Sequence, residues 1–155
     1  MNTPHLRTAI IEQFAPRFAP HAKLIYMKGA KNIAPIVDKS VLKRLGFSLE
    51  NQSIWPDVIF YVPRKRWIYL VDVAALNGPV SSPRRQELEA MFANKNTRCM
   101  YISAFVDFKE FKRHGFGIAW DTEVWIAEAP DHLIHFNGDK FLGPRRLPGQ
   151  RTKQR

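Results

Sequence analysis

The chain has 155 residues, and 45% of them are apolar, which suits one compact domain with a buried core and excludes a disordered chain. Its 24 Lys and Arg outweigh 14 Asp and Glu, and the formal net charge of +10 favours a polyanionic partner, because phosphates neutralised by Lys or Arg release condensed counterions. One cysteine excludes a disulfide framework and a cysteine-rich zinc site, and neither the apolar span nor the basic amphipathic helix typical of membrane attachment is found. The first residues carry no apolar leader, so we expect a cytoplasmic protein without a membrane partner.

Hydrophobic spacing in the first third of the chain predicts two helices separated by a strand and a loop. In chain order, we expect a helix at 5–14 ended by Pro16 and Pro20, a strand at 22–27, a loop at 28–35, and a short helix capped by the segment 38–40 and closed by Gly46.

The remainder of the chain predicts a strand-rich part interrupted by two helices. We expect strands at 58–62 and 67–73 around a turn at 63–66, a loop at 77–79, a helix with Ser82 as N-cap and Pro83 at its first position that runs to about residue 93, a strand at 98–104, a helix at 108–113, a strand at 124–127, and a hairpin of residues 133–136 with Phe141 around Asn137-Gly138.

This element order predicts an α/β fold in which helices flank a mixed β-sheet, with a β-hairpin as C-terminal extension. No internal repeat or linker divides the chain, so residues 1–144 are expected to form a single domain. The Arg-, Lys- and Gln-rich segment 145–155 is expected to be a flexible basic tail.

Two aspartates are predicted to lie side by side at the open end of the hairpin formed by 58–62 and 67–73. Opposed residues of an antiparallel pair have a constant sum of residue numbers, and a turn centred on Arg64 and Lys65 makes that sum equal to the sum for Asp57 and Asp72. Directly opposed residues point to the same face with Cβ atoms about 5 Å apart. The two carboxylates should therefore be neighbours.

Two neighbouring carboxylates repel each other unless a cation, a proton or water compensates the charge. Mg²⁺ suits such a pair, because it binds a few carboxylate oxygens, retains water and accepts phosphate oxygens as further ligands. In that position it would polarise a phosphodiester and activate water. The alternative is that Asp57 only begins a strand and Asp72 only lies at a solvated strand end.

Two arginines follow the second aspartate at the start of a predicted helix. Arg84 and Arg85 lie in its first turn, where the helix dipole disfavours positive charge. A bound phosphate would explain them, since it could use both the helix N-terminus and the guanidinium groups. Two exposed arginines at a small energetic cost are the alternative interpretation.

Several sequence segments resemble those of the C-terminal catalytic domain of the BsuBI/PstI restriction endonucleases, which belong to the PD-(D/E)XK nucleases. Pro56-Asp57 with an acid at the end of the next strand is the general nuclease pattern and is weak by itself. The more specific segments are FAPRFAP at 14–20, WPDV at 55–58, NGPV at 77–80, WDTEVWIA at 120–127, APDHLIHFNG at 129–138 and FLGP at 141–144. The resemblance covers roughly residues 10–144.

The resemblance implies a PD-(D/E)XK nuclease-like fold and Mg²⁺-dependent cleavage of double-stranded DNA at a short palindrome by a homodimer, without a small-molecule cofactor. It also implies that the first helix donates an acid, and Glu12 is the candidate, although an exposed helix position explains that residue equally well. Asp57, Asp72 and Glu12 are thus the candidate metal ligands, and Asp57, Asp72, Arg84 and Arg85 the candidate catalytic residues.

The basic stretches and one turn supply candidate DNA contacts. Phosphate contacts from such residues position a duplex without specifying its sequence. Each of these side chains is also compatible with a solvated surface. The candidates are Lys28, Lys31, Arg64, Lys65, Arg66 and Asn77.

The chain departs from the family at positions that bear on catalysis. The family usually has Glu at the position of Asp72, Ser-His in place of Leu76-Asn77 and Lys in place of Arg84. The general nuclease signature also has Lys in place of Ala74, but the family itself lacks that lysine, so its absence is not decisive. Asp is one methylene shorter than Glu, and Arg is a poor proton donor or acceptor because its pKa stays above about 12. Two hypotheses therefore remain open: a type II endonuclease that requires Mg²⁺, and a non-catalytic DNA-binding module on the same scaffold.

Overall fold

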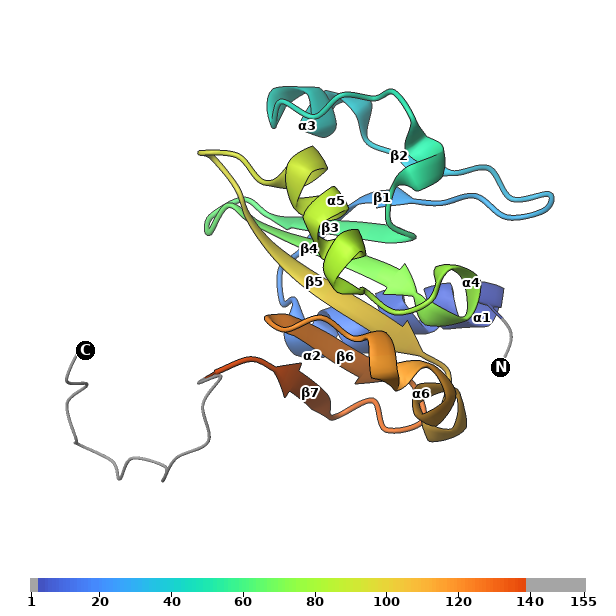
Figure 1. Ribbon diagram of the computed structural model, residues 1–155. Coiled ribbons are helices and arrows are strands. Elements are labelled where there is room, and N and C mark those ends of the chain that lie inside the picture. Colours follow the sequence, from blue (N-terminus) through green and yellow to red (C-terminus); the bar gives the residue numbers. More distant parts are fainter. Residues whose placement is uncertain (1–2, 139–155) are drawn as a thin grey trace, which may run out of the picture.

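A seven-stranded mixed sheet with the strand order β2-β1-β3-β4-β5-β6-β7 forms the centre of the computed structural model, which describes residues 3–138 (Figure 1). The β4–β5 and β5–β6 pairs are parallel, and the other described pairs are antiparallel. The expected mixed sheet is confirmed. Its strands are β1 (Lys23–Met27), β2 (Ile36–Val37), β3 (Val58–Val62), β4 (Trp67–Val73), β5 (Arg98–Phe105), β6 (Thr122–Ile126) and β7 (Leu133–Phe136).

Helices cover both faces of this sheet (Figure 1). They are α1 (Thr3–Ala9), the π-helical turn η1 (Ile10–Phe14), α2 (Ala15–Phe18), α3 (Lys39–Arg44), the 3₁₀ turn η2 (Gln52–Ile54), α4 (Ala74–Asn77), α5 (Ser82–Phe92), α6 (Phe108–His114) and the 3₁₀ turn η3 (Gly115–Gly117). None of the helices in the described part of the chain is both long and apolar enough to cross a membrane.

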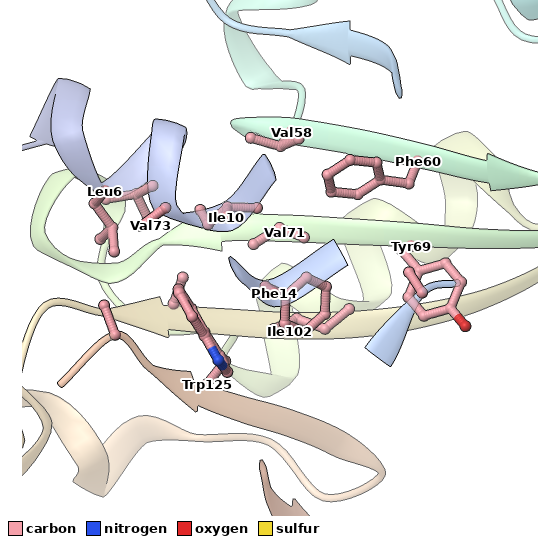
Figure 2. Packing of buried hydrophobic residues seen from close by; sticks show 14 of the residues in the cluster. Leu6, Ile10, Phe14, Val58, Phe60, Tyr69, Val71, Val73, Ile102 and Trp125 are labelled. Carbon is pink, nitrogen blue, oxygen red and sulfur yellow. The ribbon is translucent and has the colours of Figure 1, made fainter. Parts of the chain in front are cut away.

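One face of the sheet is covered by the helical segment at the start of the chain. Leu6, Ile10 and Phe14 project from it onto strand residues such as Val71 and Trp125 (Figure 2). Phe14 and Trp125 meet edge to face, with ring centroids 5.7 Å apart. The periodic apolar residues that predicted this helix are thus its buried stripe.

The expectation that Pro16 ends the first helix is wrong. The chain passes from α1 through the π-helical turn η1 into α2, and Pro16 lies in the first turn of α2. A proline lacks a backbone N–H and its ring collides with the preceding turn of a regular helix. The π-helical turn changes the hydrogen-bond pattern at that point, so the chain continues helically to Phe18.

The other face is covered by α3 and α5. Leu42 and Leu88 pack there with Ile59, Leu70 and other buried apolar residues. Every residue of β3 is buried, because its side chains alternate between the two covered faces, which explains its uninterrupted apolar sequence.

The N-cap of α5 is Ser81 rather than the expected Ser82. The Ser81 hydroxyl accepts a hydrogen bond from the Arg84 backbone N–H at 3.3 Å. Pro83 is therefore the second residue of the helix rather than the expected first, and it still lies in the first turn. Two adjacent serines before a proline offer the same capping chemistry, so the sequence pattern leaves the boundary open by one residue.

The register of the β3–β4 hairpin agrees with the residue arithmetic. Val58 pairs with Val71 and Val62 with Trp67, so every pair has the sum required by a turn centred on Arg64 and Lys65. Extending this register by one position sets Asp57 opposite Asp72.

Other differences concern short elements and the C-terminal part. The sequence pattern did not predict β2, η2 or α4, which are two to four residues long. β7 pairs with β6 and is the last strand in the order of the sheet. The expected partner of β7 at Phe141 and the expected tail at 145–155 lie outside the described residues.

Candidate active site

Asp57 and Asp72 lie at the same edge of the sheet, and both residues are fully buried. Asp57 immediately precedes β3, and Asp72 is the last residue but one of β4. Burying two carboxylates is costly unless each is paired and hydrogen-bonded. The partners of each therefore determine what this pair can do.

Asp57 is held by a side chain and by the backbone of β4. Its Oδ1 accepts a hydrogen bond from Nη2 of Arg7 at 2.9 Å, and its Oδ2 accepts one from the Val73 N–H at 2.8 Å. Arg7 comes from α1, and its side chain is only 8% exposed. The Asp57–Val73 bond joins the two strands at the open end of the hairpin, next to Asp72.

Asp72 is bound in a two-pronged ion pair by Arg84 of α5. Arg84 Nε donates to Oδ2 at 2.7 Å, and Nη2 donates to Oδ1 at 3.1 Å. The same guanidinium donates to Oε2 of Glu87 at 2.6 Å and to the Ile54 carbonyl at 2.7 Å. This fork matches carboxylate geometry in a way that a lysine ammonium cannot.

Burial has the largest effect on the protonation of Asp72. It raises the pKa of the Asp72 carboxyl above its ordinary value, and the nearby charge of Asp57 adds to the rise. The hydrogen bonds and charge of Arg84 and the charge of Lys28 act in the opposite direction without cancelling it. Burial alone would lower the pKa of Arg84, but Asp72 and Glu87 hold that pKa above its ordinary value.

Lys28, which directly follows β1, is the third cation near the pair. Its backbone N–H donates to the Asp57 carbonyl at 2.8 Å. Its Nζ donates to the carbonyls of Ser53 and Trp55, at 3.0 and 3.2 Å. Since its charge also acts on Asp72, Lys28 belongs to the surroundings of the carboxylate pair and is less free to bind phosphate than an exposed lysine.

The donor chemistry of the pair fits Mg²⁺, which prefers oxygen ligands and retains water. The four carboxylate oxygens each accept one of the protein hydrogen bonds described above, so each keeps a lone pair for a cation. The guanidinium groups of Arg7 and Arg84 already neutralise the pair, so a metal would compete with them for charge.

Glu12 does not join the pair. It is exposed on η1, and within residues 3–138 no three His, Cys, Asp or Glu side chains are grouped closely enough to share a metal ion. The first helical segment contributes a cation, Arg7, where the resemblance implied an acid.

Three further residues predicted from the sequence, Arg85, Asn77 and Lys31, have no hydrogen bond to the carboxylates of Asp57 and Asp72 among the contacts described above. Arg85 is not directed at Asp72, because its guanidinium stacks over the Tyr101 ring at 5.4 Å. Asn77 is exposed at the end of α4, which directly follows β4. Lys31 is exposed in the loop after β1. All three come from elements next to those that carry the carboxylates.

Arg64, Lys65 and Arg66 form the exposed turn at the opposite end of the β3–β4 hairpin. The five residues of β3 and Pro63 separate Arg64 from Asp57, a distance of about 23 Å at the usual rise of a strand. The structure therefore does not bring this basic turn to the carboxylates.

Arg7 is the site residue that the sequence analysis missed. It lies three, four and seven positions before Ile10, Ile11 and Phe14, on the stripe that faces the sheet. A charged residue on an apolar stripe is the signal that could have identified it, because a buried arginine needs an acidic or carbonyl partner.

Comparisons with known proteins agree with this fold. Residues 2–139 match the family model described as the BsuBI/PstI restriction endonuclease domain. The type II restriction enzyme BsuBI of Bacillus subtilis is 40% identical over 136 residues, which is 88% of this chain and 43% of that enzyme. The type II restriction enzyme AplI of Arthrospira platensis is 32% identical over 116 residues, which is 73% of this chain and 36% of that enzyme.

A solved structure gives the same result for the fold. The structure of SdaI restriction endonuclease superposes with a TM-score of 0.84 at 29% sequence identity, covering 95% of this chain and 46% of that chain. The expected nuclease-like fold is therefore confirmed. In each of these comparisons the chain spans less than half the length of its relative.

Proposed function

The chain belongs to the BsuBI/PstI restriction endonuclease domain family, and on that premise we propose that it hydrolyses phosphodiester bonds of double-stranded DNA in a Mg²⁺-dependent reaction. The observation that carries the proposal is the buried pair of Asp57 and Asp72 at one sheet edge. Such a pair has no need to exist for stability alone, since buried charges cost free energy when they are desolvated.

Asp57 and Asp72 are the residues that would hold the metal. Mg²⁺ supplies polarisation of the phosphodiester and activation of water when it is bound. Arg7 and the Val73 N–H keep the Asp57 carboxylate in one orientation. Arg84 is held by Asp72 and Glu87, and it would donate a hydrogen bond to a phosphate oxygen and stabilise the negative charge of the transition state.

Arg85 is the second cation that we propose for the phosphate, because it follows Arg84 at the start of α5 and its Nε, which is buried, has no acceptor in the described part of the chain. The stacking on Tyr101 limits its motion. A bound phosphate oxygen would satisfy this Nε, which is otherwise a buried donor without a partner.

DNA would approach the edge of the sheet at which the carboxylates lie. Lys28, Lys31 and Asn77 come from elements at that edge, and the net charge of +10 favours the approach. Arg64, Lys65 and Arg66 would contact a duplex that extends along the hairpin. If the DNA site is a palindrome, a homodimer with two-fold symmetry would match its symmetry. The compartment that we propose is the cytoplasm.

A non-catalytic DNA-binding module is the second candidate. The observation in its favour is that guanidinium groups already neutralise both carboxylates, with Arg84 bound to Asp72 through two hydrogen bonds. In such a module the ion pairs would hold the sheet edge together, and metal would have no role.

Plasmid cleavage separates the two candidates. We expect the protein to cut supercoiled plasmid with Mg²⁺ and not with EDTA, and we expect Asp57→Asn to reduce the rate by about 100-fold or more, since even outer partners of metal ligands cost 10–100-fold. Asp131→Asn is the matched control, because Asp131 is an exposed carboxylate paired with Arg17. Cleavage that survives in Asp57→Asn, or that the wild type lacks over a range of sequences, would reject the proposal.

A further inference from the structure

One buried arginine links a carboxylate to a loop on the outside of the molecule. Arg7 donates from Nη2 to Asp57, at 2.9 Å, and from Nη1 to two successive carbonyls, those of Lys28 and Gly29, at 3.1 and 3.2 Å. It therefore joins three parts of the chain that are distant in sequence: α1, the start of the loop after β1, and the residue that immediately precedes β3.

The loop that Arg7 contacts, residues 28–35, ends in a tight turn at its tip, around Lys31 and Asn32. Ala30 and Ile33 exchange two backbone hydrogen bonds, of 3.0 and 2.9 Å. A Cβ on Gly29 would lie 2.7 Å from the Ile33 carbonyl oxygen, so this position admits only glycine without movement of the backbone. A displacement of the loop would thus be transmitted to the carbonyls that Arg7 binds.

The outer part of the same loop presents surface suited to DNA. The loop extends from the body of the molecule between β1 and β2 (Figure 1). Lys31 is exposed, and Ile33 beside it is 51% exposed. A cation next to an exposed apolar side chain on a protruding loop is a combination found in proteins that contact a DNA groove.

We propose that Arg7 is a positioning residue, which couples the loop 28–35 to the Asp57 carboxylate so that DNA held by the loop fixes the orientation of that carboxylate. The inference rests on the proposed function, because it takes DNA as the ligand of the loop and Asp57 as a metal ligand. It adds a residue and a coupling that the carboxylate pair alone does not supply.

A purely structural role explains the geometry of Arg7 less well. Its Nε is buried without an acceptor among the described residues. An apolar side chain would fill the same space without leaving a donor unsatisfied, and buried ion pairs often stabilise a fold no more than such replacements do. The double contact with Lys28 and Gly29 is what an apolar residue would lose.

Arg7→Lys tests the proposal, because lysine keeps the charge and lacks the fork that spans Asp57 and both carbonyls. We expect the folded variant to bind duplex DNA in EDTA within about threefold of the wild type, to bind Mg²⁺ about tenfold more weakly by calorimetry with duplex bound, and to cleave about 10–100-fold more slowly in single turnovers. Arg17→Lys is the matched control, since Arg17 forms an exposed ion pair with Asp131, and we expect it to change none of these values.

Hydrogen exchange at the Val73 amide provides a readout that does not depend on cleavage, because this N–H donates to Asp57. Duplex DNA in EDTA should slow its exchange in the wild type and not in Arg7→Lys. Gly29→Ala, which moves the loop from its other side, should weaken the same response even if Arg7→Lys does not fold.

The outcomes separate this inference from the proposed function. A wild type that binds duplex and protects Val73 without cleaving DNA leaves the coupling intact and rejects the proposed function. Equal protection of Val73 in the wild type and Gly29→Ala, or a folded Arg7→Lys with wild-type Mg²⁺ affinity and rate, overturns the coupling.

Discussion

At the scale of single residues, two buried carboxylates, Asp57 and Asp72, are each held by an arginine that comes from a helix. The pairing of Asp57 with Asp72 follows from the register of one hairpin, which is local information. Arg7 and Arg84 reach these carboxylates from α1 and α5, and such contacts depend on how helices pack on the sheet. Arg84 was expected to bind phosphate, because its sequence position alone does not place its side chain against Asp72.

The raised pKa of Asp72 predicts a specific dependence of stability on pH. The folded state binds the proton more tightly than the unfolded chain, so the stabilisation from protonation is complete below the ordinary value of 3.8 and is lost as the pH rises through the folded pKa. We expect Asp72→Asn to remove this loss. Urea unfolding from about pH 4 to pH 8 measures the free energy of unfolding of both proteins. If the difference between wild type and variant does not vary with pH, the raised pKa of Asp72 is contradicted.

The Arg84–Asp72 ion pair predicts a large effect of removing one partner. Arg84→Met leaves a carboxylate whose side chain is 1% exposed without its partner, and we expect a loss of about 3–5 kcal/mol in the free energy of unfolding at neutral pH. Glu87→Gln, which alters only the half-exposed partner of Arg84, should cost less than about 1 kcal/mol. Similar losses in the two variants would show that the buried pair is not special.

At the scale of elements, the sequence predicted the long ones well and the short ones poorly. The strands β3, β4 and β5 have strong β-branched and aromatic patterns, and their expected bounds differ from the observed ones by at most one residue. The two-residue β2 and the four-residue α4 are stabilised by their neighbours in the fold. The continuation of the first helical segment past Pro16 was not predictable, because a π-helical turn is not visible in a hydrophobic pattern.

Ser81 and Ser82 form a matched pair for testing the start of α5. We expect Ser81→Ala to reduce the free energy of unfolding by about 1 kcal/mol, because the Arg84 N–H loses its acceptor, and we expect Ser82→Ala to have little effect. Chemical denaturation of both variants measures the difference. A larger effect at Ser82 would restore the N-cap expected from the sequence.

At the scale of the whole molecule, helices cover both faces of the sheet, and the buried carboxylates of Asp57 and Asp72 lie together at one end of its central strands. Composition and element order were sufficient to predict this architecture, because two covered faces require apolar central strands. The direction from which DNA approaches was not predictable. Two of the basic segments, at 28–31 and 64–66, prove to lie at opposite ends of the hairpin that carries the pair.

The overall charge predicts DNA binding that weakens steeply with salt. Lys31→Ala should reduce the slope of log K against log salt concentration by about 1, the value expected for the loss of one phosphate contact. Lys31→Arg should retain the wild-type slope. Fluorescence anisotropy with a labelled duplex in EDTA gives both slopes, and an unchanged slope in Lys31→Ala would remove this loop from the DNA interface.

The central claim is that Asp57 and Asp72 bind one metal ion together. Its most direct test is titration of Mn²⁺, a spectroscopic substitute for Mg²⁺, into the duplex-bound protein with the free ion followed by electron paramagnetic resonance. We expect Asp57→Asn and Asp72→Asn each to abolish the tightest site of the wild type, and the double variant to lose nothing further. A tightest site that persists in either single variant would contradict the claim.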